Sequence, residues 1–367
     1  MNILITNTRA PGGLELARLL HQAGHRVFSF ESFRFHLGLN SKSIIKNYHC
    51  SSPRFKPNEY VNQINNVIER ENIEMIIPCF EESFYISKFQ KKINCSNIYV
   101  ENIDLLRKVH HKYDFIKLSI ELGLNVPESH LIESQEDFDQ LGLKSNDYVF
   151  KPCFSRYGEE VIISPAIYRF IEGSWVCQKR IFGRSYCTYS TCKAGKVLSL
   201  AIYPVEIVFG KVCTSFCSID QEHSDYKKIK EWVKTFVDKT SFTGQVGFDF
   251  IVDQEALAIE CNPRMTSGIH LFNDNSNFTQ SLFEPMEIVE PQKGVQMNMT
   301  LLFGFTPKFY LTAIDKTIKG RDVIFKLNDI WPFINQFSLF FYILILSIRK
   351  KLSLSKITSY DIEWNGE

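Results

Sequence analysis

The chain has 367 residues, which is enough for two or three domains of roughly 100–200 residues each. Hydrophobic residues make up 44% of it, so a sizeable core is available. Its 42 lysines and arginines nearly balance 41 aspartates and glutamates, which argues against both a nucleic-acid-binding surface and an acidic, disordered chain.

The ten cysteines are poorly spaced for a metal site, because the closest pairs, Cys187 with Cys192 and Cys213 with Cys217, form no CxxC motif. The N-terminus has neither the basic start nor the long apolar stretch of a signal peptide. We therefore expect a cytoplasmic protein whose cysteines are reduced and mostly buried.

The first hundred residues have the pattern of an α/β domain. An apolar run at 2–7 ends in a turn at 10–13 (APGG), a helical pattern follows, and residues 25–30 (HRVFSF) form a second strand. Residues 74–78 (EMIIP) form another buried strand, so a parallel sheet is expected. The turn lacks the full GxGxxG motif, and we therefore expect a Rossmann-like domain that binds no dinucleotide.

The middle of the chain predicts an α+β region with two blocks of strands. A helical region at about 105–130 precedes the first block, and an amphipathic helix at 224–239 comes before the last hairpin. Alternating faces and short turns indicate strands at 148–151, 175–178, 186–192, 196–203, 247–252 and 257–261.

Three oxygen-bearing side chains near the end of these strands form the strongest candidate site. In GFDFIVDQEALAIECNPRMTSG, Asp249 lies on one strand, while Glu260 and Asn262 share a face of the next. Two carboxylates and an amide oxygen are ligands suited to Mg²⁺ that bridges nucleotide phosphates. Arg264 follows closely and can stabilise charge on a carboxyl-phosphate group. By residue type alone, a polar sheet edge fits these residues equally well.

Two lysines are candidates for binding phosphate. Lys151 ends a predicted strand beside the loop 153–158 (CFSRYG), and Lys112 begins a helix in HHKYDF. A lysine at a strand end can neutralise phosphate oxygens, although any single lysine is more often a solvated cation. The loop contains one glycine, Gly158, and is a weak phosphate loop by composition.

A third candidate is the strand end WVCQKRIFG. Its apolar residues run into Gln178, Lys179, Arg180 and Ile181, whose backbone groups could follow the edge of an adenine while Ile181 packs on the ring. An ordinary strand end is the alternative.

The α/β domain, the two lysines, the strand end WVCQKRIFG and the run from Asp249 to Arg264 follow one another along the chain. In that order they resemble the ATP-grasp superfamily over about residues 1–275, most closely its carbamoyl-phosphate-synthase-like branch. The run ECNPRMTSGIH is the most specific string. The resemblance implies a Rossmann-like α/β domain at 1–104 and an ATP-grasp domain of two α+β subdomains at 105–280, with nucleotide between them. A partly helical C-terminal extension would cover 281–367.

The resemblance also implies the cofactors, ATP and Mg²⁺ with Mn²⁺ able to substitute, and the roles of the candidate residues. Lysines would contact the phosphates, and the arginine would steady an acyl phosphate. The implied residues are Lys112, Lys151, Ser155, Gln178, Lys179, Arg180 and Ile181 for ATP, Asp249, Glu260 and Asn262 for metal, and Arg264 with Lys151 for catalysis.

The sequence departs from the family pattern in two places. Residues 155–157 (SRY) stand where most members have glycines, and Gly183 is followed by residues 184–185 (RS) instead of a ribose-binding acid. Glu81 and Glu82 resemble the paired acids of related chains and are expected to face the cleft. Ser267, His270 and Tyr203 are weaker candidates for the cleft, with plain packing as their alternative.

The resemblance implies a ligase that activates a carboxylate as an acyl phosphate and passes it to an amine or a thiol. Its partners would be a small-molecule carboxylate and an amine or amino acid; nucleic acid is not expected, and a homodimer is left open. The alternative is a nucleotide-binding protein without ligase turnover that acts as a scaffold or partner subunit.

The C-terminal region carries no assignable chemistry. Residues 337–348 (FSLFFYILILSI) precede the basic residues 349–351 and are too few to span a bilayer. We expect a buried helix there, with a helix on a membrane surface as the alternative. Ile362 and Trp364 predict that the end of the sequence packs on the body.

Overall fold

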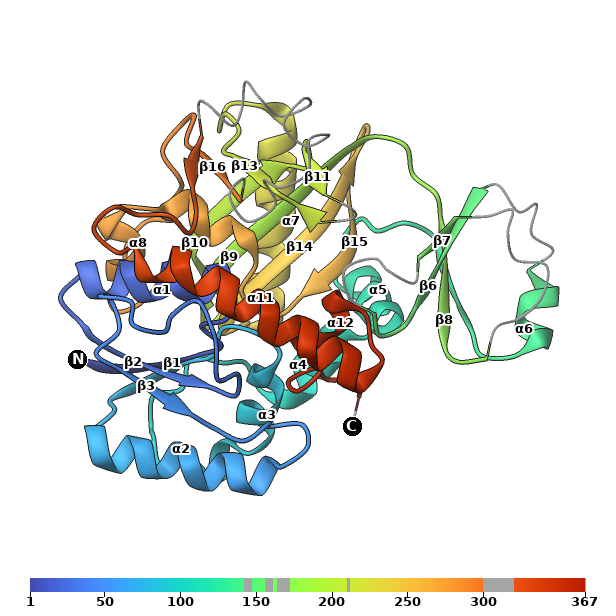
Figure 1. Cartoon of the computed structure of the whole chain (residues 1–367). Helices are drawn as coiled ribbons and strands as arrows, with labels where there is room; N and C mark the ends of the chain where they lie inside the picture. Colours follow the sequence, from blue (N-terminus) through green and yellow to red (C-terminus); the bar gives the residue numbers. More distant parts are fainter. Residues whose placement is uncertain (142–146, 156–160, 164–171, 210–211, 300–319, 367) are drawn as a thin grey trace.

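The computed structural model describes residues 1–141, 147–155, 161–163, 172–209, 212–299 and 320–366. Three sheets organise the described chain, with the long C-terminal helix lying across the molecule (Figure 1). The predicted fold class is confirmed: a parallel α/β domain precedes two antiparallel, strand-rich subdomains.

The N-terminal domain contains a parallel four-stranded sheet in the order β3-β2-β1-β4. Pro11 starts α1, and the apolar face of that helix packs into the core with β1. Its elements are β1 (Asn2–Thr6), α1 (Pro11–Gln22), β2 (Arg26–Glu31), β3 (Lys46–His49), α2 (Pro57–Glu71), β4 (Met75–Ile77), α3 (Glu82–Lys88) and the 3₁₀ helix η1 (Gln90–Lys92).

The first subdomain of the middle region is a small antiparallel sheet in the order β5-β8-β6-β7. The expected helical region is two helices, because His111 has an extended backbone and its side chain caps the second helix by accepting from the N–H of Asp114. The elements are α4 (Ile103–His110), α5 (Lys112–Glu121), β5 (Ser129–Ile132), α6 (Gln135–Gln140), β6 (Tyr148–Pro152), β7 (Ile162–Ile163) and β8 (Trp175–Lys179).

The second subdomain is a longer antiparallel sheet in the order β10-β9-β14-β15. Aromatic side chains of α7, including Trp232, pack on Phe248 and Phe250 beneath one face of this sheet. The elements are β9 (Arg184–Lys193), β10 (Lys196–Pro204), β11 (Val208–Phe209), β12 (Val212–Cys213), β13 (Ser215–Cys217), α7 (Ser224–Thr240), β14 (Gly244–Val252), β15 (Ala256–Asn262), η3 (Ser267–Phe272) and α8 (Ser276–Ser281).

The C-terminal region contributes β16 (Gln296–Asn298) and β17 (Arg321–Asp322), which form a small sheet with β13, followed by α11 (Trp331–Lys350) and α12 (Leu354–Ser359). The expectation of a buried helix is wrong for α11. It has 20 residues, is long and apolar enough to cross a membrane, and only 17% of its most apolar window is buried. Its inner face alone meets the body, so the outer face remains in solvent.

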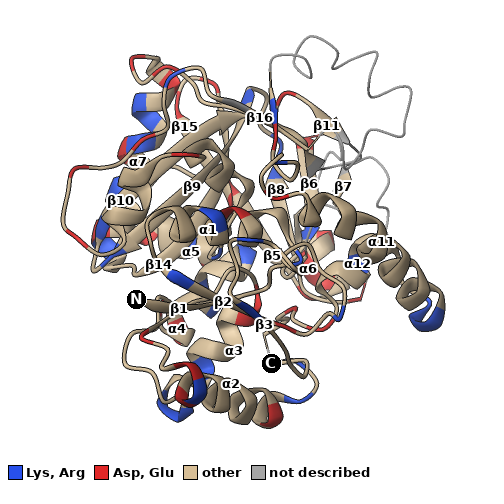
Figure 2. Ribbon diagram, turned by 60° about the vertical axis from the view of Figure 1, so that its left-hand side comes forward, with Lys and Arg blue, Asp and Glu red and all other residues tan. Residues whose placement is uncertain are grey.

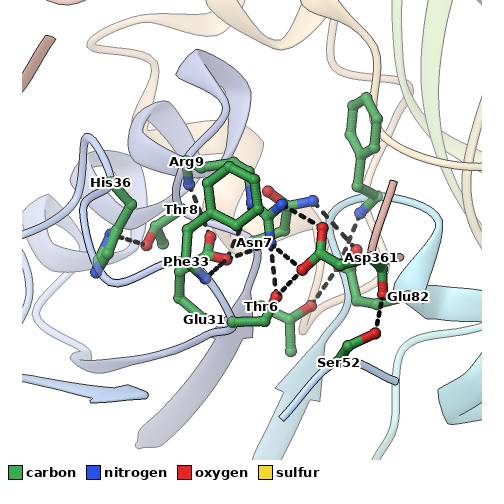
Figure 3. Close-up of polar contacts among 12 residues, drawn as sticks. Thr6, Asn7, Thr8, Arg9, Glu31, Phe33, His36, Ser52, Glu82 and Asp361 are labelled. Carbon is green, nitrogen blue, oxygen red and sulfur yellow. Dashed lines mark hydrogen bonds and ion pairs between the residues drawn. The ribbon is translucent and has the colours of Figure 1, made fainter. Parts of the chain in front are cut away.

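The end of the chain packs on the body, as predicted. Ile362 is 2% exposed and Trp364 is fully buried, with its ring stacked on Phe84 at 5.8 Å between centroids. The Arg9 guanidinium binds Glu31 of β2 and Asp361 of the C-terminal segment, at 2.5 and 2.7 Å (Figure 3). The C-terminal segment therefore fills the space beside the carboxyl ends of the parallel strands.

Candidate active site

Lys112, at the start of α5, links the two subdomains of the middle region. Its side chain is buried, and the Nζ atom donates to the carbonyl oxygen of Ser155 at 3.1 Å. The same Nζ lies 3.5 Å from Oε1 of Glu260 on β15. Its backbone N–H donates to the carbonyl of Cys153, so the lysine holds the loop after β6 in place. Residues 156–158 of the predicted phosphate loop lie outside the described residues.

Lys151, near the end of β6, is buried and contacts the side chain of Gln178 on β8. Its Nζ donates to Oε1 of Gln178 at 2.8 Å, and the Gln178 amide donates in turn to Ser129 Oγ at 3.2 Å. The pKa of Lys151 is lowered to about 8, mainly because the lysine is buried; the charge of Lys112 adds to this shift, and Glu260 and Asp249 oppose it. An anion placed beside Lys151 would restore its charge.

Asp249 and Glu260 face each other across the β14–β15 pair. The pairing shifts register directly after Asp249, a local irregularity next to the site. Burial raises the pKa of Asp249, and the neighbouring Glu260 carboxylate raises it further, because two like charges are held side by side. Asn262 joins them, with its amide nitrogen 3.4 Å from Oδ2 of Asp249.

These residues fit a magnesium ion, since a cation between the two carboxylates would remove their repulsion. Among the described residues no group of three His, Cys, Asp or Glu side chains is arranged to hold a metal. The chain would therefore supply two carboxylates and the Asn262 amide oxygen, and nucleotide phosphates and water would complete the six oxygen ligands that Mg²⁺ prefers. The Asn262 oxygen now accepts from Arg264 Nη2 at 3.3 Å.

Arg264 follows β15 and is poised to bind an anion. Its guanidinium carbon lies 4.2 Å from the centre of the Phe80 ring, and Nε lies 3.8 Å from Oε1 of Glu81. Nε is buried and makes no hydrogen bond within the described part of the chain. The other Glu81 oxygen, Oε2, accepts from the backbone N–H of Trp364 at 3.0 Å. The C-terminal segment thus helps to position the arginine through Glu81.

Glu81 and Glu82 do not share the cleft as expected. Glu81 faces Arg264, whereas Glu82 turns into the N-terminal domain and accepts from Thr6 Oγ1 at 2.5 Å and from the N–H groups of Cys79 and Phe80 (Figure 3). The reason is local, because α3 starts at Glu82 and consecutive helical residues point in different directions.

Several polar groups of residues 178–181, at the end of β8, already make hydrogen bonds within the first subdomain. The Gln178 side chain holds Lys151 and does not face away as an adenine contact. The N–H groups of Lys179 and Arg180 donate to the carbonyls of Glu128 and Asp147, at 2.8 and 2.6 Å. The part of this edge expected to meet adenine is therefore limited to the remaining backbone groups and Ile181. Their role in binding ATP stays a prediction.

Two of the three weaker candidates belong to the core, whereas Ser267, the first residue of η3, is half-buried. His270 is 1% exposed and lies 3.4 Å from Glu15 of α1, while Tyr203 is buried with its ring edge-on to Phe216. Packing is thus the better account of both. Sequence reasoning missed Cys187, a half-buried thiol that pairs with Asp249 across β9 and β14 and hydrogen-bonds its carboxylate. Its place on the strand that follows the candidate adenine-binding segment 178–181 was the available signal.

A cavity of about 600 Å³ lies beside the loop that Lys112 holds. His111, Cys153 and Ser155 contribute to its lining, and so do Lys356 and Glu363 of the C-terminal region.

A family model of the ATP-grasp domain matches residues 109–268, a span that includes the residues predicted to bind ATP and metal and Arg264. The chain therefore contains an ATP-grasp domain. No curated protein sequence matches the chain at a significant level.

Several solved structures share the fold over most of the chain. N5-carboxyaminoimidazole synthetase from Staphylococcus aureus is 13% identical, with a TM-score of 0.62 over 77% of this chain and 76% of its own. L-amino acid ligase from Bacillus licheniformis is 16% identical, with a TM-score of 0.57 over 76% and 72%. The biotin carboxylase domain of the Hydrogenobacter thermophilus 2-oxoglutarate carboxylase, solved with MgADP and bicarbonate, is 12% identical, with a TM-score of 0.61 over 80% and 73%.

Proposed function

We propose that the chain is an ATP-dependent ligase that joins a carboxylate to an amine through an acyl phosphate. The observation that carries this proposal is the convergence of three cations, Lys112, Lys151 and Arg264, on the facing carboxylates Asp249 and Glu260. Like charges are left adjacent within each group, which is the arrangement expected where a highly charged ligand binds.

The two half-reactions assign a task to each cation. A carboxylate oxygen attacks the γ-phosphorus of ATP, and ADP leaves with the electrons of the broken P–O bond. Lys112 and Lys151 would neutralise the phosphate oxygens, and Arg264 would stabilise the charge shared by carboxylate and phosphate. The amine then attacks the acyl carbon and phosphate leaves. Magnesium, when bound by Asp249 and Glu260, supplies a counter-charge to the phosphates.

The related folds support this reaction class. The solved neighbours include a ligase and a synthetase by name, and one holds MgADP. A thiol in place of the amine, Mn²⁺ in place of Mg²⁺ and a homodimer remain further proposals. We also propose a cytoplasmic location, which the ten free cysteines support because thiols stay reduced there.

An isotope experiment tests the proposal. Carboxylic acids labelled with ¹⁸O are paired with amines and amino acids in the presence of Mg-ATP, and ADP and phosphate are measured. Acyl-phosphate chemistry transfers one ¹⁸O from the acid to the phosphate. Release of AMP and pyrophosphate, or ATP binding without turnover across the whole panel, would contradict the ligase and in the latter case favour a nucleotide-binding partner subunit.

A further inference from the structure

The solvent side of α11 is a continuous apolar stripe. Its side chains recur every three or four residues and therefore lie on one face of the helix. They range from 44% exposed at Ile334 to 70% at Ile348, and together they carry a single polar atom, the indole nitrogen of Trp331. The stripe, called here the outward face of α11, consists of Trp331, Ile334, Phe337, Phe340, Phe341, Ile345 and Ile348.

The opposite face of α11 is already used, so the helix cannot turn to hide this stripe. Leu339 is buried in the core that α1 and β1 share, and the Tyr342 ring lies 5.3 Å from that of Phe33. The amide of Asn335 donates to the carbonyls of Leu37 and Leu39. A helix with apolar side chains on both sides is expected to be covered on both, and the described part of the chain covers one side only.

The charges around the stripe have one sign. Residues 330–360 contain four cations, Arg349, Lys350, Lys351 and Lys356, and no aspartate or glutamate. Three of the four follow one another at the C-terminal end of α11, where Figure 2 shows a basic tip on an otherwise uncharged helix. Beside the helix, the exposed Phe35 contacts the Tyr342 ring at 5.6 Å and adds to the apolar surface.

We propose that the outward face of α11 docks the protein on an anionic lipid membrane, with the helix lying in the plane of the surface. The apolar side chains would enter the boundary between headgroups and acyl chains, and Arg349, Lys350 and Lys351 would meet lipid phosphates. Trp331 at the opposite end is suited to the headgroup level. A protein–protein interface usually includes about ten direct hydrogen bonds, and the side chains of the outward face of α11 offer a single polar atom for them. A lipid surface requires no such fixed hydrogen bonds and therefore fits this face better.

Vesicle flotation of the full chain tests this proposal. The protein is expected to float with vesicles of phosphatidylcholine and phosphatidylglycerol, and to bind pure phosphatidylcholine vesicles about 100-fold more weakly. A triple variant, Phe337→Ser, Phe341→Ser and Ile348→Ser, should weaken vesicle binding by about 1000-fold, because each apolar side chain contributes about tenfold. Replacing Arg349, Lys350 and Lys351 by glutamine should weaken binding to the anionic vesicles by about 100-fold. The binding that remains should depend little on salt concentration.

Matched controls keep the result interpretable. Ile120→Ser with Met286→Ser removes apolar side chains that are exposed elsewhere and should leave flotation unchanged. ATP affinity and thermal unfolding of the triple variant should equal those of the wild type. Equal binding to both kinds of vesicle would overturn the proposal, as would resistance to extraction by alkaline carbonate, which indicates a spanning helix. A dimer that the triple variant dissociates would also overturn it and identify a second copy as the occupant.

Discussion

Two buried charge clusters in this molecule differ in how far they are neutralised. Around Arg9, the guanidinium is clamped by Glu31 and Asp361, so that each charge has a partner of opposite sign (Figure 3). Burial alone would lower the pKa of Arg9, but the two carboxylates outweigh it and raise that pKa. Around Lys151 burial lowers the pKa of the lysine, and the charges of Glu260 and Asp249 do not outweigh that burial.

The comparison separates a structural cluster from a candidate catalytic one. The Arg9 cluster satisfies itself within the chain and gains nothing from a ligand. The cluster of Lys151, Asp249 and Glu260 holds like charges next to each other, a cost that bound nucleotide and magnesium would remove. Mutation should therefore affect stability in the first cluster and turnover in the second.

The largest effect is expected at Glu260. Glu260→Gln should lower the rate of ADP release by about 100- to 1000-fold, because one of two carboxylates facing the phosphates is lost. The free energy of unfolding should change little, since relief of the repulsion with Asp249 offsets loss of the ion pair with Lys112. Steady-state ADP release and chemical denaturation measure the two quantities. Glu222→Gln, at an exposed carboxylate far from the site, is the control.

Arg9→Met should show the opposite behaviour. Removing the cation leaves Glu31 and Asp361 buried without a partner, which should lower the free energy of unfolding by about 3 kcal/mol. Denaturant titration measures this loss, while the ATP affinity of the folded protein should stay close to that of the wild type. Lys227→Met removes the cation of an exposed ion pair and should leave the denaturation midpoint unchanged. An equal loss of stability in this control would show that the effect of Arg9→Met does not come from the buried charge cluster.

The pH dependence of ATP binding sharpens the comparison further. Lys151 binds phosphate in its charged form, and its pKa in the folded chain is about 8. The dissociation constant for ATP should therefore rise by up to about tenfold per pH unit above that value. Stability moves the other way: the unfolded lysine keeps its proton to higher pH, so this group makes folding more favourable as the pH rises from about 8 to the ordinary lysine range. Calorimetry at several pH values measures the slope, and Lys151→Met should abolish it.

The smallest effect is expected from Glu81, which touches Arg264 and not the reacting atoms. Glu81→Gln should lower kcat by about fivefold, equivalent to about 1 kcal/mol of positioning, with the KM for ATP nearly unchanged. The adjacent Glu82→Gln is the matched comparison, because Glu82 binds Thr6 and neighbouring backbone groups and should affect stability more than kcat. Equal losses of kcat in the two variants would argue against a positioning role.

Much of the fold follows from local patterns, and so does part of the site. Strand alternation predicted that Glu260 and Asn262 share a face, and cross-strand pairing then brings Asp249 opposite. The strands β3 (KNYH) and β5 (SHLI) were missed because their polar residues hide the alternation. The helix start at Lys112 was predicted, but the division of the helical region into α4 and α5 was not stated, because a histidine cap has a weak sequence signal.

Long-range contacts could not be predicted in the same way. The approach of Glu81 to Arg264 joins residues far apart in sequence, and no local pattern encodes it. The exposure of α11 was also beyond sequence reasoning, because an apolar run of that length normally signals burial. Whether such a run is covered depends on the shape of the rest of the molecule.

The contact between Trp364 and Glu81 has a consequence for the order of biosynthesis. Arg264 and Glu81 leave the ribosome well before Trp364 does, so a nascent chain holds the arginine without the backbone donor that steadies its partner. The geometry around Arg264 is therefore completed only after translation has passed Trp364. Reporter sequences fused directly after this residue would lie close to Glu81 and Arg264.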